Sequence, residues 1–280
     1  MTEPEQPAKY TPPQIAYGID IGMYRTGKSE NVLSTTTFAW GRVEAAAKLK
    51  SKIENGKRVF SISPDSSENR GNDISELVES IRTDLNNGKR IALGMEAPMW
   101  QPVPALTQDS KSEYDLFVAR FDEESKYQWY LQSGAAALAK ALSIGKLLLT
   151  LLDDDNTLNE VSFSLTDSEK ANIELYEGFV AGDWKLDQSE TSELSDHCWD
   201  ALVTAIGFHY AKREVNKEKE EQIATIHSAN TEDRTVISHW HTILDDLNSK
   251  SEDSNSDCLV VGFYKHNEKL HEQTDINLKP

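Results

Sequence analysis

Residues 14–22 read Gln-Ile-Ala-Tyr-Gly-Ile-Asp-Ile-Gly, and their larger apolar side chains alternate with small ones. This period of two predicts a β-strand with one apolar face. The other face carries only small residues and Asp20, which lies near the carboxyl end of the strand. Because burying an unpaired charge is costly, Asp20 is expected either to serve a metal or catalytic site or to cap the turn that follows.

A second strand repeats this pattern at residues 90–96. Ile91, Leu93 and Met95 alternate with a small-residue face that ends in Glu96. Strand-like and helix-like segments alternate along the chain, which predicts an α/β fold. Ligands of such folds bind beyond the carboxyl ends of the strands, so Asp20 and Glu96 are expected to face one site.

The remaining segments define a main domain with two extensions. Further strands are predicted at residues 32–40, 58–62, 161–165, 173–180 and 258–264. Helices are predicted at residues 43–53, 73–85, 127–152, 193–222 and 236–247. We expect a proline-containing tail at 1–13, a main domain at 14–222, and a small C-terminal α/β appendage at 223–280.

Composition excludes several classes of protein. The 280-residue chain has no run of about 20 apolar residues, so no membrane span is expected, and residues 1–9 lack a signal-peptide core. The two cysteines, Cys198 and Cys258, fit a reducing cytoplasm and cannot form a zinc-ligand set by themselves. A cytoplasmic location is therefore the expectation.

The charge of the chain is uneven. The formal net charge is −18; residues 1–60 hold nine Lys/Arg against six Asp/Glu, and the remainder holds 20 against 41, so all of the negative excess lies beyond residue 60. An acidic body repels nucleic acid at long range. The concentrated basic stretch, Arg42–Arg58, is a candidate contact for nucleic acid, although a solvated face of the predicted helix also explains it.

A carboxylate cluster at the predicted site requires compensation. Asp196 and Asp200 lie four residues apart in the predicted helix 193–222, and therefore on one helix face. Carboxylates about 4 Å apart repel by roughly 4 kcal/mol per pair at an effective dielectric constant near 20. Divalent cations remove this cost, and oxygen-only ligands favour Mg²⁺ or Mn²⁺ over Zn²⁺.

Four motifs, in this order along the chain, resemble the RNase H-like nucleases. Tyr17-Gly-Ile-Asp20-Ile-Gly22 is similar to the Asp-bearing first strand of that superfamily, and Gly94-Met-Glu96-Ala-Pro98 to its fourth-strand acid. Ile173-Glu174-Leu-Tyr176 resembles the Glu-x-Tyr strand of a group of predicted RNase H-like nucleases, with Glu177 where that group usually has proline. His197-Cys-Trp-Asp200-Ala201 resembles the His-x-x-Asp-Ala helix of RuvC-type resolvases.

This resemblance implies a fold, an activity and a set of residues. The fold is a mixed sheet flanked by helices, and the activity is hydrolysis of DNA or RNA phosphodiester bonds with two Mg²⁺ or Mn²⁺ ions. Asp20 would bridge both ions, while His197 would orient a water or replace a carboxylate. The implied metal ligands are Asp20, Glu96, Asp200 and Asp196, and the implied catalytic residues are Asp20, Glu96, Asp200, Glu174 and His197. Ordinary structural positions also explain Glu174, His197 and Asp196.

Two other interpretations remain open. Gly22-Met-Tyr-Arg-Thr-Gly27-Lys28-Ser29 matches the P-loop pattern, which indicates a nucleotide-binding ATPase that uses Gly22, Gly27, Lys28 and Ser29, with residues 147–153 as the apolar run before a magnesium-binding Asp. Residues 29–38 are a poor helix, however, whereas a P-loop needs a helix to start at its Lys-Ser pair. The third interpretation is a non-catalytic protein that binds a basic partner through its acidic surface, or a protein partner through the C-terminal appendage.

Overall fold

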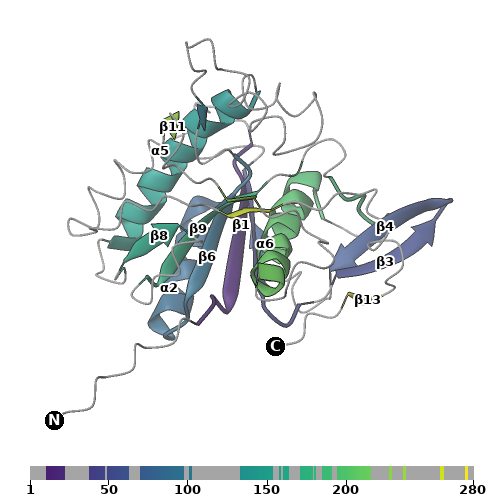
Figure 1. The fold of residues 1–280 in the computed structure, drawn as a ribbon, viewed down its shortest axis with the longest axis horizontal. Helices are drawn as coiled ribbons and strands as arrows, with labels where there is room; N and C mark the ends of the chain where they lie inside the picture. Colours follow the sequence, from purple (N-terminus) through teal and green to yellow (C-terminus); the bar gives the residue numbers. More distant parts are fainter. Residues whose placement is uncertain are drawn as a thin grey trace.

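The structure is a computed structural model (Figure 1). It describes residues 11–22, 38–47, 49–62, 70–97, 101–102, 133–153, 158, 160–163, 171–178, 180, 185–190, 194–215, 227–228, 236–237, 259–261 and 275–276. The helices are α2 (Ile74–Asn86), α5 (Ser133–Asp153) and α6 (Asp196–Val215). The longer strands are β1 (Ile15–Asp20), β2 (Ala39–Glu44), β3 (Leu49–Glu54), β4 (Lys57–Ile62), β6 (Ile91–Met95) and β9 (Ile173–Gly178). The shorter strands are β5 (Arg70–Gly71), β7 (Gln101–Pro102), β8 (Val161–Phe163), β10 (His227–Ser228), β11 (Val236–Ile237), β12 (Leu259–Val261) and β13 (Asp275–Ile276).

The central sheet is mixed. In the described residues it has eight strands in the order β10-β12-β9-β6-β1-β2-β5, with β8 also paired to β9. β1, β6 and β9 are parallel neighbours, whereas β2 runs antiparallel to β1 and β5 antiparallel to β2. The parallel pairing of β1 with β6 brings the carboxyl ends of both strands to the same edge.

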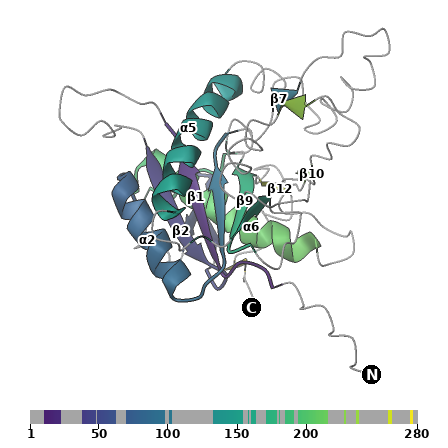
Figure 2. The ribbon, with the colours of Figure 1, turned by 90° about the vertical axis from the view of Figure 1, so that its left-hand side faces the viewer.

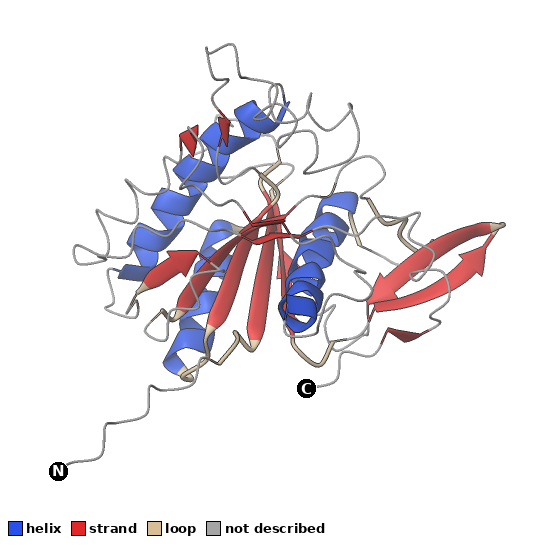
Figure 3. Ribbon diagram, viewed as in Figure 1, coloured by secondary structure: helices blue, strands red, loops and turns tan. Residues whose placement is uncertain are grey.

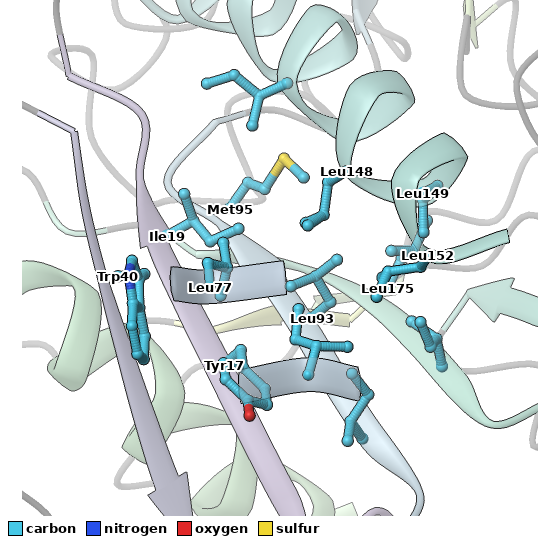
Figure 4. Close-up of a cluster of buried hydrophobic side chains, with 14 of the residues drawn as sticks. Tyr17, Ile19, Trp40, Leu77, Leu93, Met95, Leu148, Leu149, Leu152 and Leu175 are labelled. Atoms are coloured by element: carbon cyan, nitrogen blue, oxygen red, sulfur yellow. The ribbon is translucent and has the colours of Figure 1, made fainter. Parts of the chain in front are cut away.

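Helices cover both faces of this sheet (Figures 2 and 3). α2 and α5 pack on one face, where Tyr17, Leu93 and Leu148 belong to one buried apolar cluster (Figure 4). α6 packs on the other face, where Ala16 and Leu202 belong to a second cluster. The alternation of β1 and β6 follows this division, because their larger apolar residues face α2 and α5 and their small residues face α6. The chain is therefore an α/β protein whose mixed sheet is flanked by helices, as expected at this level.

Several predicted elements occur with shifted ends. The predicted helix 73–85 is α2, and Asp73 is its N-cap, since the Asp73 carboxylate accepts hydrogen bonds from the backbone N–H groups of Ser75 and Glu76. The predicted strands 90–96 and 173–180 are β6 and β9.

The predicted helix at residues 43–53 is wrong. Residues 43–47 form the end of β2 and a turn, and residues 49–53 form most of β3, which pairs with β4. Val43 and Leu49 are fully buried in the cluster beneath α6, and this burial in a sheet outweighs the helix propensity of the Ala- and Lys-rich sequence. The basic stretch Arg42–Arg58 is consequently not the face of a helix. Its first member is not an open cation either, because Arg42 donates two hydrogen bonds to the buried Asp84, at 2.7 and 2.9 Å.

Described strands of the expected C-terminal appendage join strands from earlier in the chain. β12 pairs with β9, β11 with β7, and β13 with β3. Residues 236 and 237 are strand β11 where a helix 236–247 was predicted, and residues 238–247 lie outside the described residues. Among the described helices, none is long and apolar enough to cross a membrane.

Candidate metal centre

Three carboxylates meet at the carboxyl edge of the sheet. Asp20 is the last residue of β1, Glu96 directly follows β6, and Asp200 lies in the second turn of α6. One carboxylate oxygen of each residue lies within 4.8 Å of the other two. The pairing of β1 with β6 sets this arrangement, because Ile19 is level with Met95 and the Glu96 N–H donates to the Ile19 carbonyl at 2.8 Å.

The small-residue face of β1 lets α6 deliver its carboxylate. A Cβ atom added at Gly18 would overlap the backbone carbonyl oxygen of Ala201, the residue that follows Asp200. The helix backbone therefore rests directly on the strand, and only glycine fits between them. This close approach explains why position 18, between Tyr17 and Ile19 of the strand and near the acidic site, is a glycine.

Asp20 serves two structural partners in addition to the cluster. Its Oδ1 accepts the Gly22 N–H at 2.9 Å, so it caps the turn after β1, where Gly22 has a φ of 45°. Its Oδ2 accepts a hydrogen bond from His197 Nδ1 at 2.6 Å. The two readings of Asp20 from the sequence, a turn cap and a member of an acidic site, are thus both present in one side chain. His197 contacts a proposed ligand instead of lying apart from the site.

Asp200 is buried with one oxygen paired and one open. Lys185 Nζ donates to Asp200 Oδ2 at 2.6 Å. The other oxygen, Asp200 Oδ1, is buried and has no hydrogen-bond partner among the described residues. Since leaving a buried polar atom unpaired is costly, a cation bound at the cluster would stabilise this oxygen.

The cluster changes the protonation of its own members. Burial raises the pKa of Glu96 well above its usual range, and the negative charges of Asp20 and Asp200 raise it further. Burial also raises the pKa of Asp200, to about 6, although the Lys185 ammonium opposes the change. The Asp200 carboxylate in turn raises the pKa of Lys185 against the effect of burial. A bound cation would relieve the repulsion that shifts both acids.

The donor set suits a hard divalent cation. All three side chains offer carboxylate oxygens, the ligands preferred by Mg²⁺ and Mn²⁺. The open Asp200 Oδ1 is an atom that such an ion would satisfy. Residues Asp20, Glu96 and Asp200 therefore fit an oxygen-coordinated divalent ion.

Two further predicted residues lie apart from this cluster. Glu174 is level with Ala92 near the start of the parallel strands, about four residues and roughly 13 Å before the edge that carries Glu96. It is fully buried there, in ion pairs with Arg90 at 3.0 Å and Lys212 at 3.4 Å. The prediction that Glu174 shares the site is corrected by this register. Asp196 is exposed at the first residue of α6, and its carboxylate is not part of the three-residue group.

Sequence reasoning missed Lys185. It lies in a short irregular segment before α6, where a single lysine carries no recognisable pattern. Of the P-loop residues, Gly27, Lys28 and Ser29 lie outside the described residues. Residues 147–153 lie within α5, so they are not the strand that would present a magnesium-binding Asp to a P-loop.

Comparisons with models of known protein families, with curated proteins and with solved structures found no match for this chain.

Proposed function

We propose that this protein is a divalent-metal-dependent nuclease of the RNase H-like type, which hydrolyses phosphodiester bonds of DNA or RNA. The convergence of Asp20, Glu96 and Asp200, with one oxygen of each within 4.8 Å of the others, carries the proposal. The buried and open Asp200 Oδ1 is an independent indication that a cation belongs there.

The arrangement of the sheet supports the RNase H-like assignment. β1, β2 and β5 are successive antiparallel neighbours, and β6 and β9 extend the sheet on the other side of β1, parallel to it. The first acid ends β1, and the second directly follows β6, the parallel neighbour of β1. This agrees with the positions that the resemblance assigns to the two strand acids.

In this proposal the three carboxylates bind the metal, and neighbouring residues position them. Asp20, Glu96 and Asp200 would hold the metal, and Asp196 lies one helical turn from Asp200 at the solvent-exposed rim. Bound divalent ions activate a water and stabilise the leaving oxygen of a phosphodiester. His197 donates to Asp20 Oδ2 and so fixes the orientation of this carboxylate, which makes it a positioning residue. Lys185 keeps Asp200 ionised by donating to Oδ2.

The test combines metal binding with cleavage. Labelled single-stranded DNA, duplex DNA, single-stranded RNA and an RNA–DNA hybrid are incubated with the protein in Mg²⁺, in Mn²⁺ and in chelator. We expect cleavage of at least one of them with either ion and none in chelator. Asp20→Asn and Asp200→Asn should each abolish cleavage and weaken Mn²⁺ binding measured by equilibrium dialysis. Asp153→Asn, which changes an exposed acid at the end of α5, is the matched control.

Three results would contradict the proposal. Mn²⁺ binding without cleavage of any substrate would leave a metal-binding protein that is not a nuclease. Cleavage that survives Asp20→Asn and Asp200→Asn would place the chemistry elsewhere or in a contaminant. ATP hydrolysis that is lost on Lys28→Ala would favour the P-loop interpretation.

A further inference from the structure

The β3–β4 hairpin is a separate protruding element of the fold. Its strands pair from Leu49 with Ile62 to Glu54 with Lys57, and the turn between them is Asn55–Gly56. Both turn residues have positive φ, 49° and 78°, as a tight hairpin turn requires. The turn extends away from the central sheet and its helices (Figure 1).

The two faces of the hairpin differ in chemistry. Leu49, Phe60 and Ile62 lie on one face and are buried in the apolar cluster under α6. The opposite face carries Lys50, Lys52 and Lys57, and all three lysines are exposed. The base of the hairpin is therefore anchored in the core, while a row of three exposed lysines lies on the other face, together with Glu54 and the buried Val59.

This row contrasts with the rest of the molecule. Residues 49–62 contain the cations Lys50, Lys52, Lys57 and Arg58 against the single acid Glu54, in a chain whose formal net charge is −18. Lys52 forms an ion pair with Glu54, an exposed pair that contributes little to stability.

A short segment links the hairpin to the acidic cluster. Phe60 exchanges two backbone hydrogen bonds with this segment, one to the Asp187 carbonyl at 2.8 Å and one from the Ser189 N–H at 2.9 Å. Two residues earlier, Lys185 donates to Asp200. From Phe60 the hairpin extends about five residues, or roughly 17 Å, to its turn. A ligand seated at the cluster is thus within reach of the hairpin if it is as long as a few nucleotides.

We propose that the β3–β4 hairpin is an arm that binds the phosphate backbone of the nucleic acid cleaved at the acidic cluster. The inference rests on the proposed function. An acidic protein repels a polyanion, so a nuclease of this charge needs a local cationic surface to hold its substrate. The hairpin supplies one beside the site.

The end of the hairpin favours nucleic acid over an acidic protein as the ligand. Ile53, next to the turn, is 60% exposed and lies level with Arg58. An exposed aliphatic side chain beside cations is the combination with which nucleic-acid-binding arms enter a groove and contact bases or sugars. The lysines of one face then hold the backbone, while Ile53, which lies on the other face with Arg58, adds at the end of the arm an apolar contact that does not depend on salt.

The test measures binding without cleavage. Fluorescence anisotropy in chelator follows the binding of 30-nucleotide DNA single strands, the corresponding duplex and an RNA of the same length, each at several salt concentrations. The Lys50→Gln/Lys57→Gln variant removes two cations of the arm. The matched control, Lys89→Gln/Lys146→Gln, removes two exposed lysines that lie outside the hairpin. Thermal melts check that both variants fold.

Each lysine contact to phosphate contributes close to one unit to the slope of log affinity against log salt. The arm variant should therefore lose about two units of slope, and its affinity at 0.1 M salt should fall by roughly 60-fold. Ile53→Ser should weaken binding with the slope unchanged. The control variant should bind as wild type does.

The outcomes separate this inference from the proposed function. A folded arm variant that binds with wild-type affinity and slope overturns the inference, even if the protein cleaves nucleic acid. If the arm and control variants lose equal affinity, the loss reflects net charge alone, and the inference is overturned. A wild-type protein that binds none of the probes overturns the inference as well. Specific loss in the arm variant without any nuclease activity supports the arm and contradicts the nuclease.

Discussion

Replacing Asp200 with Asn should change how the stability of the metal-free protein depends on pH. Burial raises the pKa of Asp200 from 3.8 to about 6, with the Lys185 ammonium opposing and the charges of Asp20 and Asp196 adding to the shift. The folded state therefore holds the proton more tightly than the unfolded chain, and ionisation of Asp200 opposes folding. The free energy of unfolding of the wild type should fall as the pH rises from about 4 through about 6.

The size of this effect follows from the shift. A pKa difference of about two units corresponds to about 3 kcal/mol. Asp200→Asn lacks this titration, so between pH 4 and pH 7 the stability difference should move in favour of the variant by about 3 kcal/mol. The part of the Glu96 shift that burial causes is common to both proteins, whereas the part that the Asp200 charge causes is lost in the variant and adds to the difference in the same direction.

The assay is urea denaturation in chelator at steps between pH 4 and 7.5, followed by tryptophan fluorescence. Only the change of the stability difference with pH matters, so any fixed packing cost of the substitution drops out. Asp153→Asn should run parallel to wild type. At pH 7, Mn²⁺ at a hundredfold excess over its dissociation constant should raise the free energy of unfolding of the wild type by about 2.7 kcal/mol. The same ion should raise that of Asp200→Asn much less. A stability difference that stays constant across the pH range would refute the electrostatic account of the cluster.

Two further predictions concern the elements that build and surround the site. Gly18→Ala should destabilise the protein by about 3 kcal/mol or more and weaken Mn²⁺ binding, because the added methyl group meets the Ala201 carbonyl and pushes α6 from β1; melts and equilibrium dialysis measure both, and unchanged metal affinity would disprove the coupling. Glu174→Gln should cost roughly 3–5 kcal/mol in urea denaturation because it removes the buried negative charge that pairs with Arg90 and Lys212, yet it should preserve Mn²⁺ affinity; loss of metal binding in a stable variant would restore Glu174 to the site.

The acid-ended strands were predictable because two local patterns agreed. The period of two in β1 and β6 placed Asp20 and Glu96 on the small-residue faces, and the carboxyl edge of a parallel pair is where an α/β sheet binds ligands. The four-residue spacing in α6 likewise placed Asp200 on one helix face with Asp196. These inferences need only the direction of each strand and the face of each residue.

The positions of other residues depend on strand register and tertiary contacts, which one sequence alone does not reveal. Glu174 shares a face with Glu96, but its level along the sheet is set by the register of β9 against β6. Residues 43–53 have helical propensity, but Leu49 is buried by its partner Ile62 and the core under α6. The hydrogen bond from Lys185 to Asp200 joins a loop to a helix, and no periodic pattern in the sequence predicts such a contact.

The acidic cluster draws its three members from the beginning, the middle and the later part of the chain. Asp20 and Glu96 become neighbours only when β1 pairs with β6, and Asp200 joins them only when α6 docks on that pair. Bringing together segments so distant costs loop-closure entropy, which the packed sheet and helix must offset before any ion can be held. On a ribosome the acidic cluster consequently stays incomplete until α6 has emerged, so the meeting of the three carboxylates reports that β1, β6 and α6 have assembled.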